Sequence, residues 1–421
     1  EMINRYLNSE INAIWNDQNK FDTWKLVQEK YLETLEQLNI ADKGISKKIK
    51  ETEVLKEEVY EREEVTNHDL ASFVDILQEK VGKGSNWIHY GLTSSDIVDT
   101  ANSILIMQSI DTVTELMNDL LSTLQNKAME EKDTLIIGRT HGVYAEETFL
   151  GNIFGNWYLE VSRNLKRIQN SKENIAFGKF SGPVGNHSVV TEEMEKLSLK
   201  KLGLVPETFA NQIVARDRYA EVVSSLGILA SSYERIATNI RSYQRSEISE
   251  MFEAFKEGQK GSSAMPHKKN PIGSERVTGL SRIMRSYVNT SLENMVLWNE
   301  RDISNSSVER IILPDAFHLI SFMTSELNMI ISNLVINHDK IKKNLQDAKN
   351  KSMSQKFLSH LVNNGIDRDT AYRKIQDQIF KDTSLNELKE NLQVEFNVKF
   401  PDFNDDVQKN VDQNKFKDKF Q

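Results

Sequence analysis

The 421-residue chain lacks cysteine altogether, has only six prolines and carries no long apolar run. Without cysteine it has no disulfide framework and no thiolate nucleophile, and a zinc or iron–sulfur site built on cysteine is excluded. No run of about 18 apolar residues is present that would span a bilayer. The opening sequence, EMINRY, also lacks the basic and apolar regions of a secretory signal. We therefore expect a soluble protein of a reducing compartment, with the cytoplasm as the default.

Positive charge is not in excess either, since 53 Lys and Arg residues stand against 62 Asp and Glu residues, for a formal net charge of −9. A net acidic protein is poorly suited to nucleic acid or to an anionic membrane, so neither is expected as a partner. A local basic pocket can still hold an anionic small molecule. The length exceeds that at which one hydrophobic core stops growing, which predicts two or three domains.

Several cofactor signatures are missing as well. The chain has no HExxH motif, no GxxxxGK[ST] phosphate loop and no GxGxxG that opens a helix after a strand. Its candidate histidine and carboxylate ligands are flanked by Arg, Lys and Thr, which suits an anionic substrate better than a cation. We therefore expect no catalytic metal and no other cofactor, and neither ATP hydrolysis nor dinucleotide chemistry.

The scarcity of proline favours long helices, because the first 182 residues contain none. Residues 10–39 and 45–64 are predicted to form charged amphipathic helices. Residues 82–96 interrupt this pattern with three glycines, and Ser95 or Asp96 is able to cap the helix that follows.

Four segments of the chain carry apolar residues at alternating steps of three and four. These stripes consist of Ile106, Ile110, Val113, Met117, Leu120 and Leu124; of Leu150, Phe154, Trp157 and Val161; of Val222, Leu226, Leu229, Tyr233, Ile236, Ile240 and Tyr243; and of Ile320, Met323, Leu327, Ile330 and Leu334. This spacing over several turns indicates helices that pack lengthwise at a small crossing angle. Strand signals are limited to residues 134–137 and 179–184. The sequence thus predicts an all-α fold with a central bundle.

The composition changes again beyond residue 350, where the chain becomes polar and its helical segments become short. We predict three domains. Residues 1–110 form an N-terminal helical domain, residues 111–350 a central helical bundle, and residues 351–421 a C-terminal helical domain.

Residues 258–271, GQKGSSAMPHKKNP, lie within the central bundle but cannot be the interior of a helix. Their two prolines remove backbone donors, and their two glycines raise the entropy cost of order. The stretch is therefore predicted to be a loop. Its hydroxyls, ammonium groups and backbone N–H donors suit it to holding an anion, and functional residues concentrate on such loops.

Three of the eight histidines lie beside hydroxyl, Asp or Gly residues where a helical pattern is interrupted. His68 is found in TNHD, His89 in WIHYGLTSSD and His141 in GRTHG. For each of them alone, a hydrogen-bonded structural histidine is the alternative interpretation. That structural interpretation is adopted for His187, His318, His338 and His360.

A second polar cluster follows the loop at residues 298–310. Arg301, Ser306 and Arg310 would suit a phosphate, because guanidinium groups bind phosphate bidentately. The alternative is a charged helix end with intrahelical ion pairs, each of which is worth only a few tenths of a kcal/mol.

Taken together, four of these stretches resemble the fumarase/aspartase superfamily. Residues 261–271 match the superfamily loop GSSxMPxKxNP at every defined position. Within the superfamily, residues 66–69, 87–96 and 138–142, with the loop, are most similar to the adenylosuccinate lyase family. Two departures occur: Glu147 stands where proline is common in that family, and Asn67 where Arg, Lys or Glu is common.

The resemblance implies a fold in which long helices form a twenty-helix core in a homotetramer, with each active site shared between subunits. It implies an anti β-elimination that releases fumarate from two small-molecule substrates, adenylosuccinate and the succinyl-carboxamide ribotide SAICAR. An acid must protonate the leaving nitrogen while a base removes a proton beside a carboxylate. The dianionic aci-carboxylate that forms requires fixed positive groups and backbone donors.

Residue roles follow from the same resemblance. His141 resembles the general acid, oriented by Glu275, and Ser262 the general base. The other residues with a catalytic role are Lys268, which stabilises the aci-carboxylate together with Asn270, and His68, which binds phosphate or assists protonation. The substrate-binding positions are Arg5, Tyr6, Asn67, Asp69, His89, Thr93, Ser94, Gln212, Ser263, Asn270, Arg276, Arg301, Ser306 and Arg310.

Two rival interpretations remain open. Argininosuccinate lyase, aspartase and fumarase share the loop and the elimination. The second alternative is a non-catalytic helical scaffold that retains the fold, because a helical bundle does not need catalytic residues to be stable. The joint presence of Ser262, His141 and Lys268 argues against the scaffold.

Overall fold

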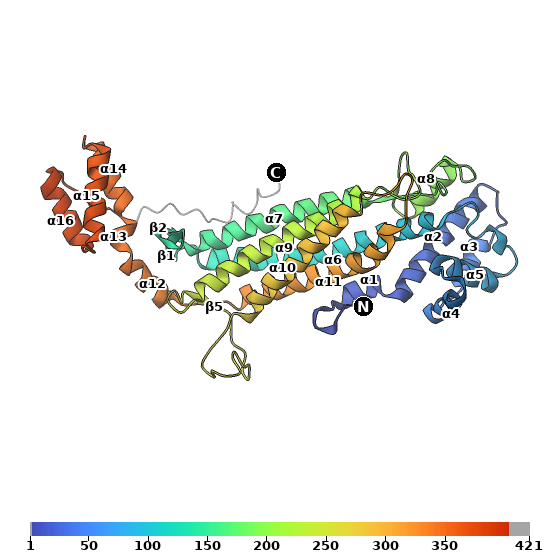
Figure 1. Ribbon diagram of the computed structural model, residues 1–421, viewed down its shortest axis with the longest axis horizontal. Coiled ribbons are helices and arrows are strands. Elements are labelled where there is room, and N and C mark those ends of the chain that lie inside the picture. Colours follow the sequence, from blue (N-terminus) through green and yellow to red (C-terminus); the bar gives the residue numbers. More distant parts are fainter. Residues whose placement is uncertain (1, 404–421) are drawn as a thin grey trace. The chain divides into compact units, whose positions relative to one another are not determined.

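The computed structural model describes residues 2–403 and consists mainly of α-helices (Figure 1). The chain divides into two compact units that both use discontinuous stretches. Unit 1 comprises Glu1–Asp119, Arg163–Glu234 and Arg276–Glu326, and unit 2 comprises Leu120–Ser162, Arg235–Glu275 and Leu327–Gln421. Residues 404–421, the end of the predicted C-terminal domain, lie outside the described residues. The predicted division into three domains stays a prediction.

A 21-residue helix and several shorter helices form the N-terminal part of unit 1. They are the 3-10 helices η1 (Asn4–Tyr6) and η2 (Ser85–Trp87) and the α-helices α1 (Ser9–Trp15), α2 (Asp17–Gln37), α3 (Ile45–Glu51), α4 (Lys56–Thr66) and α5 (Asp69–Val81). The helix predicted at 10–39 is divided at Asn16, whose side chain accepts a hydrogen bond from the Asn19 N–H and so caps α2. The helix predicted at 45–64 is divided between α3 and α4, where Val54 enters the core.

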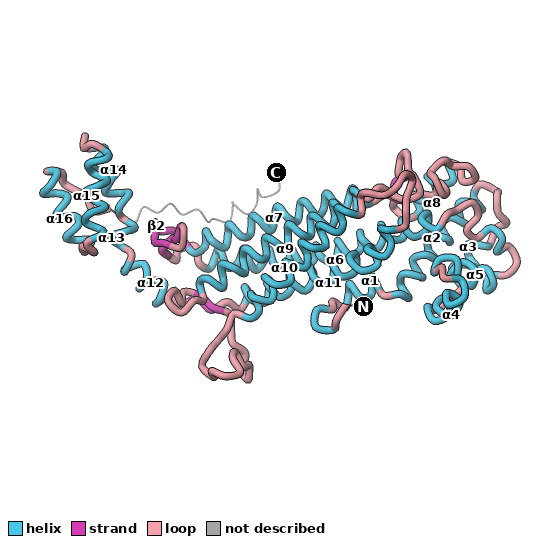
Figure 2. The backbone as a smooth tube through the Cα atoms, viewed as in Figure 1, coloured by secondary structure: helices cyan, strands magenta, loops and turns pink. Residues whose placement is uncertain are grey.

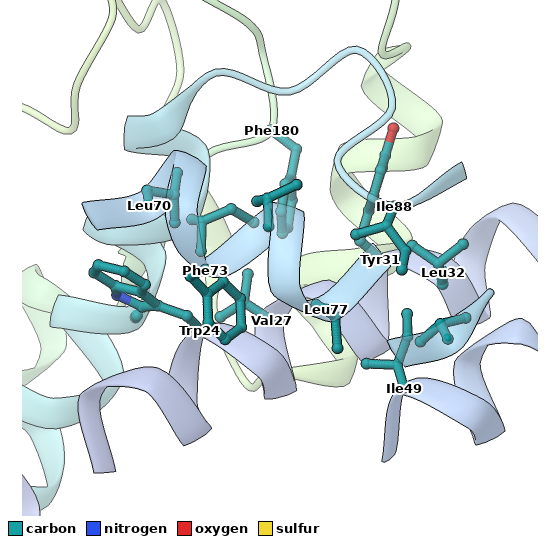
Figure 3. Packing of buried hydrophobic residues seen from close by; sticks show 14 of the residues in the cluster. Trp24, Val27, Tyr31, Leu32, Ile49, Leu70, Phe73, Leu77, Ile88 and Phe180 are labelled. Carbon is teal, nitrogen blue, oxygen red and sulfur yellow. The ribbon is translucent and has the colours of Figure 1, made fainter. Parts of the chain in front are cut away.

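An aromatic core holds these helices together (Figure 3). Trp24 meets Phe73 edge to face at 5.7 Å, and Tyr31 stacks on Phe180 at 5.4 Å. Phe180 comes from a loop that is more than a hundred residues away in the sequence, so burial of these rings fixes that loop against α2.

Five long helices run through both units. They are α6 (Ser94–Glu130), α7 (Leu150–Ile175), α9 (Asp217–Tyr243), α10 (Ile272–Glu293) and α11 (Ser304–Ser332). Nearly every residue of the four predicted apolar stripes is buried. Hydrogen bonds also join the helices: Tyr233 of α9 bonds Thr324 of α11 at 2.9 Å, and Thr123 of α6 bonds Asn328 of α11 at 2.5 Å. The prediction of an all-α fold with a helical bundle is confirmed.

The described strands form three small sheets (Figure 2). Antiparallel pairs join β1 (Leu135–Thr140) to β2 (Val143–Phe149) and β5 (Met251–Phe252) to β6 (Val335–Ile336), while β3 (Phe177–Gly178) and β4 (Val205–Pro206) pair in parallel. The extended segment predicted at 134–137 overlaps β1. The one predicted at 179–184 is wrong, because its backbone N–H groups bond the Asp96 carboxylate instead of a second strand.

The remaining helices are α8 (Glu192–Lys201) of unit 1 and α12 (His338–Asp347), α13 (Lys349–Ser352), α14 (Ser354–Asn363), α15 (Arg368–Phe380) and α16 (Leu385–Phe396) of unit 2. The last of these surround a small core of their own that includes Phe357, Leu361, Ile375 and Leu388. Among residues 2–403, none of the helices combines the length and the apolar character needed to cross a membrane.

Candidate active site

A cavity of about 460 Å³ lies within unit 1, between the start of α2, the start of α5, the start of α6 and the first turns of α11. Eight of the positions predicted to bind substrate or assist catalysis line it. They are His68, Asp69, Thr93, Ser94, Gln212, Arg301, Ser306 and Arg310. The structure therefore gathers four separate stretches of the sequence into one polar pocket.

His68 and Asp69 stand at the beginning of α5. The Nδ1 atom of His68 accepts a hydrogen bond from the Ala71 N–H at 3.2 Å, so its ring caps the helix, while Nε2 lies 3.4 Å from the Ser94 hydroxyl. Burial raises the pKa of Asp69, but the charge and hydrogen bond of Arg310, at 2.6 Å, outweigh burial and leave the pKa below its usual value. Asp69 is therefore an anion that neutralises Arg310.

Arg301 differs from the other cations that line the pocket. Its guanidinium donates to the side-chain oxygens of Gln212 at 3.0 Å, Asn305 at 3.2 Å and Ser95 at 3.4 Å. These acceptors are neutral, whereas Arg310 is paired with Asp69. Burial lowers the pKa of Arg301 relative to an exposed arginine. Because its charge is not balanced by a hydrogen-bonded carboxylate, Arg301 is the natural partner for an anionic group in the pocket.

A buried ion triad in the lining of the pocket was not anticipated from the sequence. The Arg216 side chain pairs with Asp99 on one side and Glu309 on the other, with closest approaches of 2.6 Å to each. One signal was present: Asp96 and Asp99 lie three residues apart in DIVDTAN, and the polar residues Thr100 and Ser103 continue the same helix face into the core. Carboxylates in such a place are buried only when they are paired.

Other predicted binding positions lie outside the pocket lining. Tyr6 of η1 packs edge to face on Phe322 at 4.9 Å, and its neighbour Arg5 is exposed. Asn67 ends α4 in the left-handed conformation, with φ of 51°. Arg276 forms an ion pair with Glu326 at 2.6 Å.

His89 is also outside the lining. Its ring nitrogen Nδ1 lies 3.0 Å from Gln28 Nε2, and its N–H donates to Gln28 Oε1. Burial, followed by the charge of His68, lowers the pKa of His89 to about 4. The ring is therefore neutral near pH 7. The four histidines assigned structural roles all have hydrogen-bond partners, which are Val190 for His187, Asn8 for His318, Glu131 for His338 and Lys399 for His360.

The glycine- and proline-rich segment is a loop, as predicted, and Figure 1 shows it extending away from the helices between β5 and α10. Its base is fixed on both sides. Gln244 donates to the Lys269 carbonyl at 3.2 Å, and the Glu253 carboxylate accepts from the N–H groups of Gly273 and Ser274 at the start of α10. The Asn270 amide crosses the loop and donates to the Gly261 carbonyl.

Two backbone N–H groups of the loop point at the hydroxyl of Ser262. Those of Ala264 and Met265 donate to Oγ at 3.3 and 3.2 Å. Such donors favour a negative charge on that oxygen. The neighbouring Ser263 and the Lys268 side chain are exposed, so both are accessible to a substrate or to another chain.

His141 occupies the turn of the β1–β2 hairpin. His141 and Gly142 both have positive φ, at 56° and 75°, which is the conformation that a two-residue hairpin turn requires. The hairpin is anchored because Arg139 pairs with the buried carboxylate of Glu250. The His141 ring is exposed, and in the described part of the chain it forms no hydrogen bond with Glu275, which stands exposed in the first turn of α10.

A protein metal site usually needs at least three His, Asp or Glu side chains that converge on one point. Across residues 2–403, the His, Asp and Glu side chains form no group of three that would hold a metal ion. The pocket lining does contain carboxylates, but Asp69, Asp99 and Glu309 are paired with Arg310 and Arg216. Its hydroxyls, amides and guanidinium groups are groups that bind anions and ribose or phosphate oxygens.

Comparison with known proteins places this chain among lyases. A family model described as a lyase matches residues 8–284. The adenylosuccinate lyase of Aquifex aeolicus (strain VF5) is 43% identical over an alignment of 397 residues that covers 91% of this chain and 91% of the relative. The adenylosuccinate lyase of Thermotoga maritima is 42% identical over 381 residues, covering 90% of this chain and 88% of the relative. A third protein of this name, from Helicobacter pylori (strain 26695), is also 42% identical.

Solved structures share the fold at lower sequence identity. A fumarate lyase from Mesorhizobium sp. BNC1 superposes with a TM-score of 0.82 at 19% identity, covering 92% of this chain and 90% of the other. The 3-carboxy-cis,cis-muconate lactonizing enzyme from Pseudomonas putida gives the same TM-score at 20% identity, covering 93% and 91%.

Proposed function

The chain belongs to the adenylosuccinate lyase family, as its motifs predicted, and we propose that it releases fumarate from adenylosuccinate, leaving AMP, and from SAICAR, leaving AICAR. Both are steps of purine nucleotide biosynthesis. In each, the bond between a substrate nitrogen and a succinyl carbon breaks while the adjacent carbon loses a proton. The enzyme must therefore bind a phosphorylated ribotide with two further carboxylates, supply one proton and accept another.

The observation that carries this proposal is the pocket of unit 1. Its volume of about 460 Å³ suits a nucleotide-sized ligand. Arg301 offers a charge that is not neutralised by a hydrogen-bonded carboxylate, and Ser94, Thr93 and Ser306 add hydroxyls. We assign the recognition of phosphate or succinyl carboxylate to Arg301 and Arg310, because guanidinium groups bind both bidentately.

Ser262 is the proposed base. A serine hydroxyl is a poor base in water, so the alkoxide has to be stabilised by its surroundings. The two N–H groups that donate to its oxygen support this role, since they would hold negative charge before the reaction begins. Ser262 then takes the proton from the succinyl carbon. We assign the charge of the aci-carboxylate to the Lys268 ammonium group, with Asn270 holding the loop closed.

His141 is the proposed acid that protonates the departing nitrogen, with His68 assisting it or binding phosphate. A histidine suits this task because its ordinary pKa lies near neutral pH. Its exposed position at the tip of a hairpin lets it enter a site from outside its own unit. Glu275, also exposed, is assigned to orient it once the site is assembled.

Several copies of this chain are proposed to complete each site, in a homotetramer. The pocket is lined by unit 1 alone, whereas Ser262 and His141 belong to unit 2. Within a few residues of Gln212 and Arg301 in the sequence, large apolar side chains are exposed, including Phe209, Val296 at 81% and Trp298 at 80%. Their exposure supports contacts with another chain there. The proposed compartment is the cytoplasm. Disulfides rarely form in that reducing environment, and a chain without cysteine does not depend on them.

A substrate panel tests the reaction. The purified protein is incubated separately with adenylosuccinate, SAICAR, argininosuccinate, aspartate and malate, and fumarate formation is followed by absorbance. We expect fumarate from the first two substrates alone. Release only from argininosuccinate, aspartate or malate would assign the chain to another lyase, and no fumarate from any of the five would favour a non-catalytic scaffold.

Two variants test the proton-transfer roles. Ser262→Ala should abolish turnover while adenylosuccinate still binds, as measured by calorimetry, because only the base is removed. His141→Ala should behave alike. Turnover like that of the unaltered protein in either variant would remove that residue from the mechanism.

Mixing variants tests the shared site. Ser262→Ala and Arg301→Ala lie in different units, so hybrid assemblies contain some sites in which both residues are intact. Activity should therefore rise above that of either variant when the two proteins are unfolded together and refolded. If every site is built within one chain, the mixture stays no more active than its components.

A further inference from the structure

The buried triad of Asp99, Arg216 and Glu309 uses every hydrogen-bond donor of its guanidinium group. The five N–H groups of Arg216 donate to Asp99 at 2.6 and 2.9 Å, to Glu309 at 2.6 and 3.0 Å, and to the Val214 carbonyl at 2.9 Å. The side chains are at most 9% exposed. Two carboxylates face one guanidinium, so the triad carries a net negative charge.

Stability alone does not account for such a group. Taking three charges out of water is costly, and well-packed apolar side chains of the same volume give equal or greater stability in many proteins. A buried ionic group of this kind has another use when it fixes the geometry of something beside it.

One arm of the triad leads to Arg301 through Asn305. Glu309 accepts a hydrogen bond from Asn305 Nδ2 at 3.2 Å, and Asn305 Oδ1 accepts from Arg301 Nε at 3.2 Å. The carboxylate can only accept, so it turns the nitrogen of the fully buried Asn305 amide toward itself. The amide oxygen is thereby presented to Arg301.

The other arm leads to Arg301 through Gln212. Asp99 accepts from the Val214 N–H at 2.8 Å while Arg216 donates to the Val214 carbonyl, so both backbone polar groups of Val214 are held. Two residues earlier, Gln212 Oε1 accepts from Arg301 Nη1. The two arms thus approach the same guanidinium from different segments of the chain.

The backbone of Arg301 is itself strained, with φ of 153°. A residue other than glycine stays in such a conformation only where its surroundings impose it. We propose that the triad is a positioning unit: through Asn305 and Gln212 it holds the Arg301 guanidinium in the direction that binds the anionic group of the substrate. This rests on the proposed function, and Asp99, Arg216 and Glu309 act on Arg301 rather than on the substrate.

Glu309→Gln is the test variant, because it keeps the size of the side chain and removes the charge and one acceptor. A matched control is Glu207→Gln, which alters a bidentate pair with Arg218 at 2.7 and 3.2 Å. The Glu207 side chain is 10% exposed and that of Glu309 is 9% exposed. Glu309 lines the pocket and Glu207 does not, so an effect of Glu309→Gln through Arg301 has to be separated from a direct contact with the substrate by an Arg301→Ala background.

We expect Glu309→Gln to raise KM for adenylosuccinate roughly 10-fold, the loss typical of one charge-assisted hydrogen bond, with a smaller change in kcat. Glu207→Gln should change both by less than about two-fold. The decisive measurement repeats Glu309→Gln in an Arg301→Ala background, where it should raise KM no further, because the residue through which it acts is gone.

Three results separate the possibilities. If Glu309→Gln lowers Tm but leaves KM unchanged, or raises KM equally with and without Arg301, the triad is only structural and the inference fails. If the unaltered protein releases no fumarate from adenylosuccinate or SAICAR, the proposed function fails instead. If Glu309→Gln does not fold, Asn305→Ala replaces it, because it removes the link between Glu309 and Arg301 while all three triad residues stay in place. The same KM results, with and without Arg301, then support or overturn the inference.

Discussion

A single methyl group on Gly261 should disable the loop that carries Ser262. Gly261 begins the GSSAMP segment, and a Cβ atom built there would lie 2.1 Å from the Lys268 carbonyl oxygen and 3.0 Å from the Phe255 ring. Ordinary van der Waals contacts begin at about 3.4 Å. The obstacle is backbone, so Gly261→Ala cannot be accommodated by rotating a side chain.

The required shift sets the size of the effect. To bring the contact from 2.1 Å to about 3.4 Å, the two sides of the loop must separate by more than about 1 Å. That movement breaks the hydrogen bond from Asn270 to the Gly261 carbonyl and displaces the N–H groups that face Ser262. A misplacement of about 1 Å costs on the order of 100-fold in rate. We therefore expect kcat/KM to fall by about that factor.

Stability should hardly change, because the loop residues from Ser263 to Lys269 are exposed and contribute little to the core. The assay is fumarate release by the variant, with Tm measured in parallel. The matched control is Gly279→Ala in α10, where a Cβ meets nothing within 4 Å and alanine favours the helix by about 1 kcal/mol. Gly261→Ala with kcat/KM within about two-fold of the control would refute the reasoning.

Three further predictions concern stability. Lys179→Met should lower the free energy of unfolding in a urea titration by about 3–5 kcal/mol, because it leaves the fully buried Asp96 charge without its ion-pair partner. Adding Asp96→Asn should recover part of that loss, and the absence of any recovery would contradict this explanation. The pKa of His89 is about 6.5 in the unfolded chain and about 4 in the folded protein, so the free energy of unfolding should fall by about 3 kcal/mol as the pH drops from 6.5 to 4 and then level off. His89→Asn should lack this pH-dependent fall, and an unchanged pH profile in that variant would exclude His89 as its source. Tyr233→Phe should cost about 1 kcal/mol by removing the buried bond to Thr324 while leaving activity intact, and an equal loss of activity would point to a different role.

The long helices were predictable because their apolar stripes are local features of the sequence. Met117 and Trp157 are buried at the positions that the spacing indicated. The break at Asn16 was harder to foresee, since an asparagine inside an amphipathic pattern can either point to solvent or cap a new helix. Only the packing of α1 and α2 decides between them.

The pocket was predictable as a set of residues but not as a geometry. The motifs and the family resemblance named Asp69, Gln212 and Arg310, yet nothing in them shows that Arg310 is paired with Asp69 while Arg301 has no hydrogen-bonded carboxylate. The ion-pair partners of Arg216 could not be predicted from the sequence for a similar reason. Asp99 and Glu309 are 117 and 93 residues away, and pairings over such separations are set by the fold.

The division of labour between the two units bears on how such enzymes diversify. The groups proposed to recognise a ligand line a cavity built by unit 1, while Ser262, Lys268 and His141, which are proposed to carry out the elimination, lie on a loop and a hairpin of unit 2. No loop side chain from Ser263 to Lys269 is buried, so packing places little constraint on which residues occupy that stretch. Chemical function is then the main constraint on its sequence. On the proposed assignments, a descendant can exchange pocket side chains and acquire a new substrate while the residues proposed for the elimination stay unchanged.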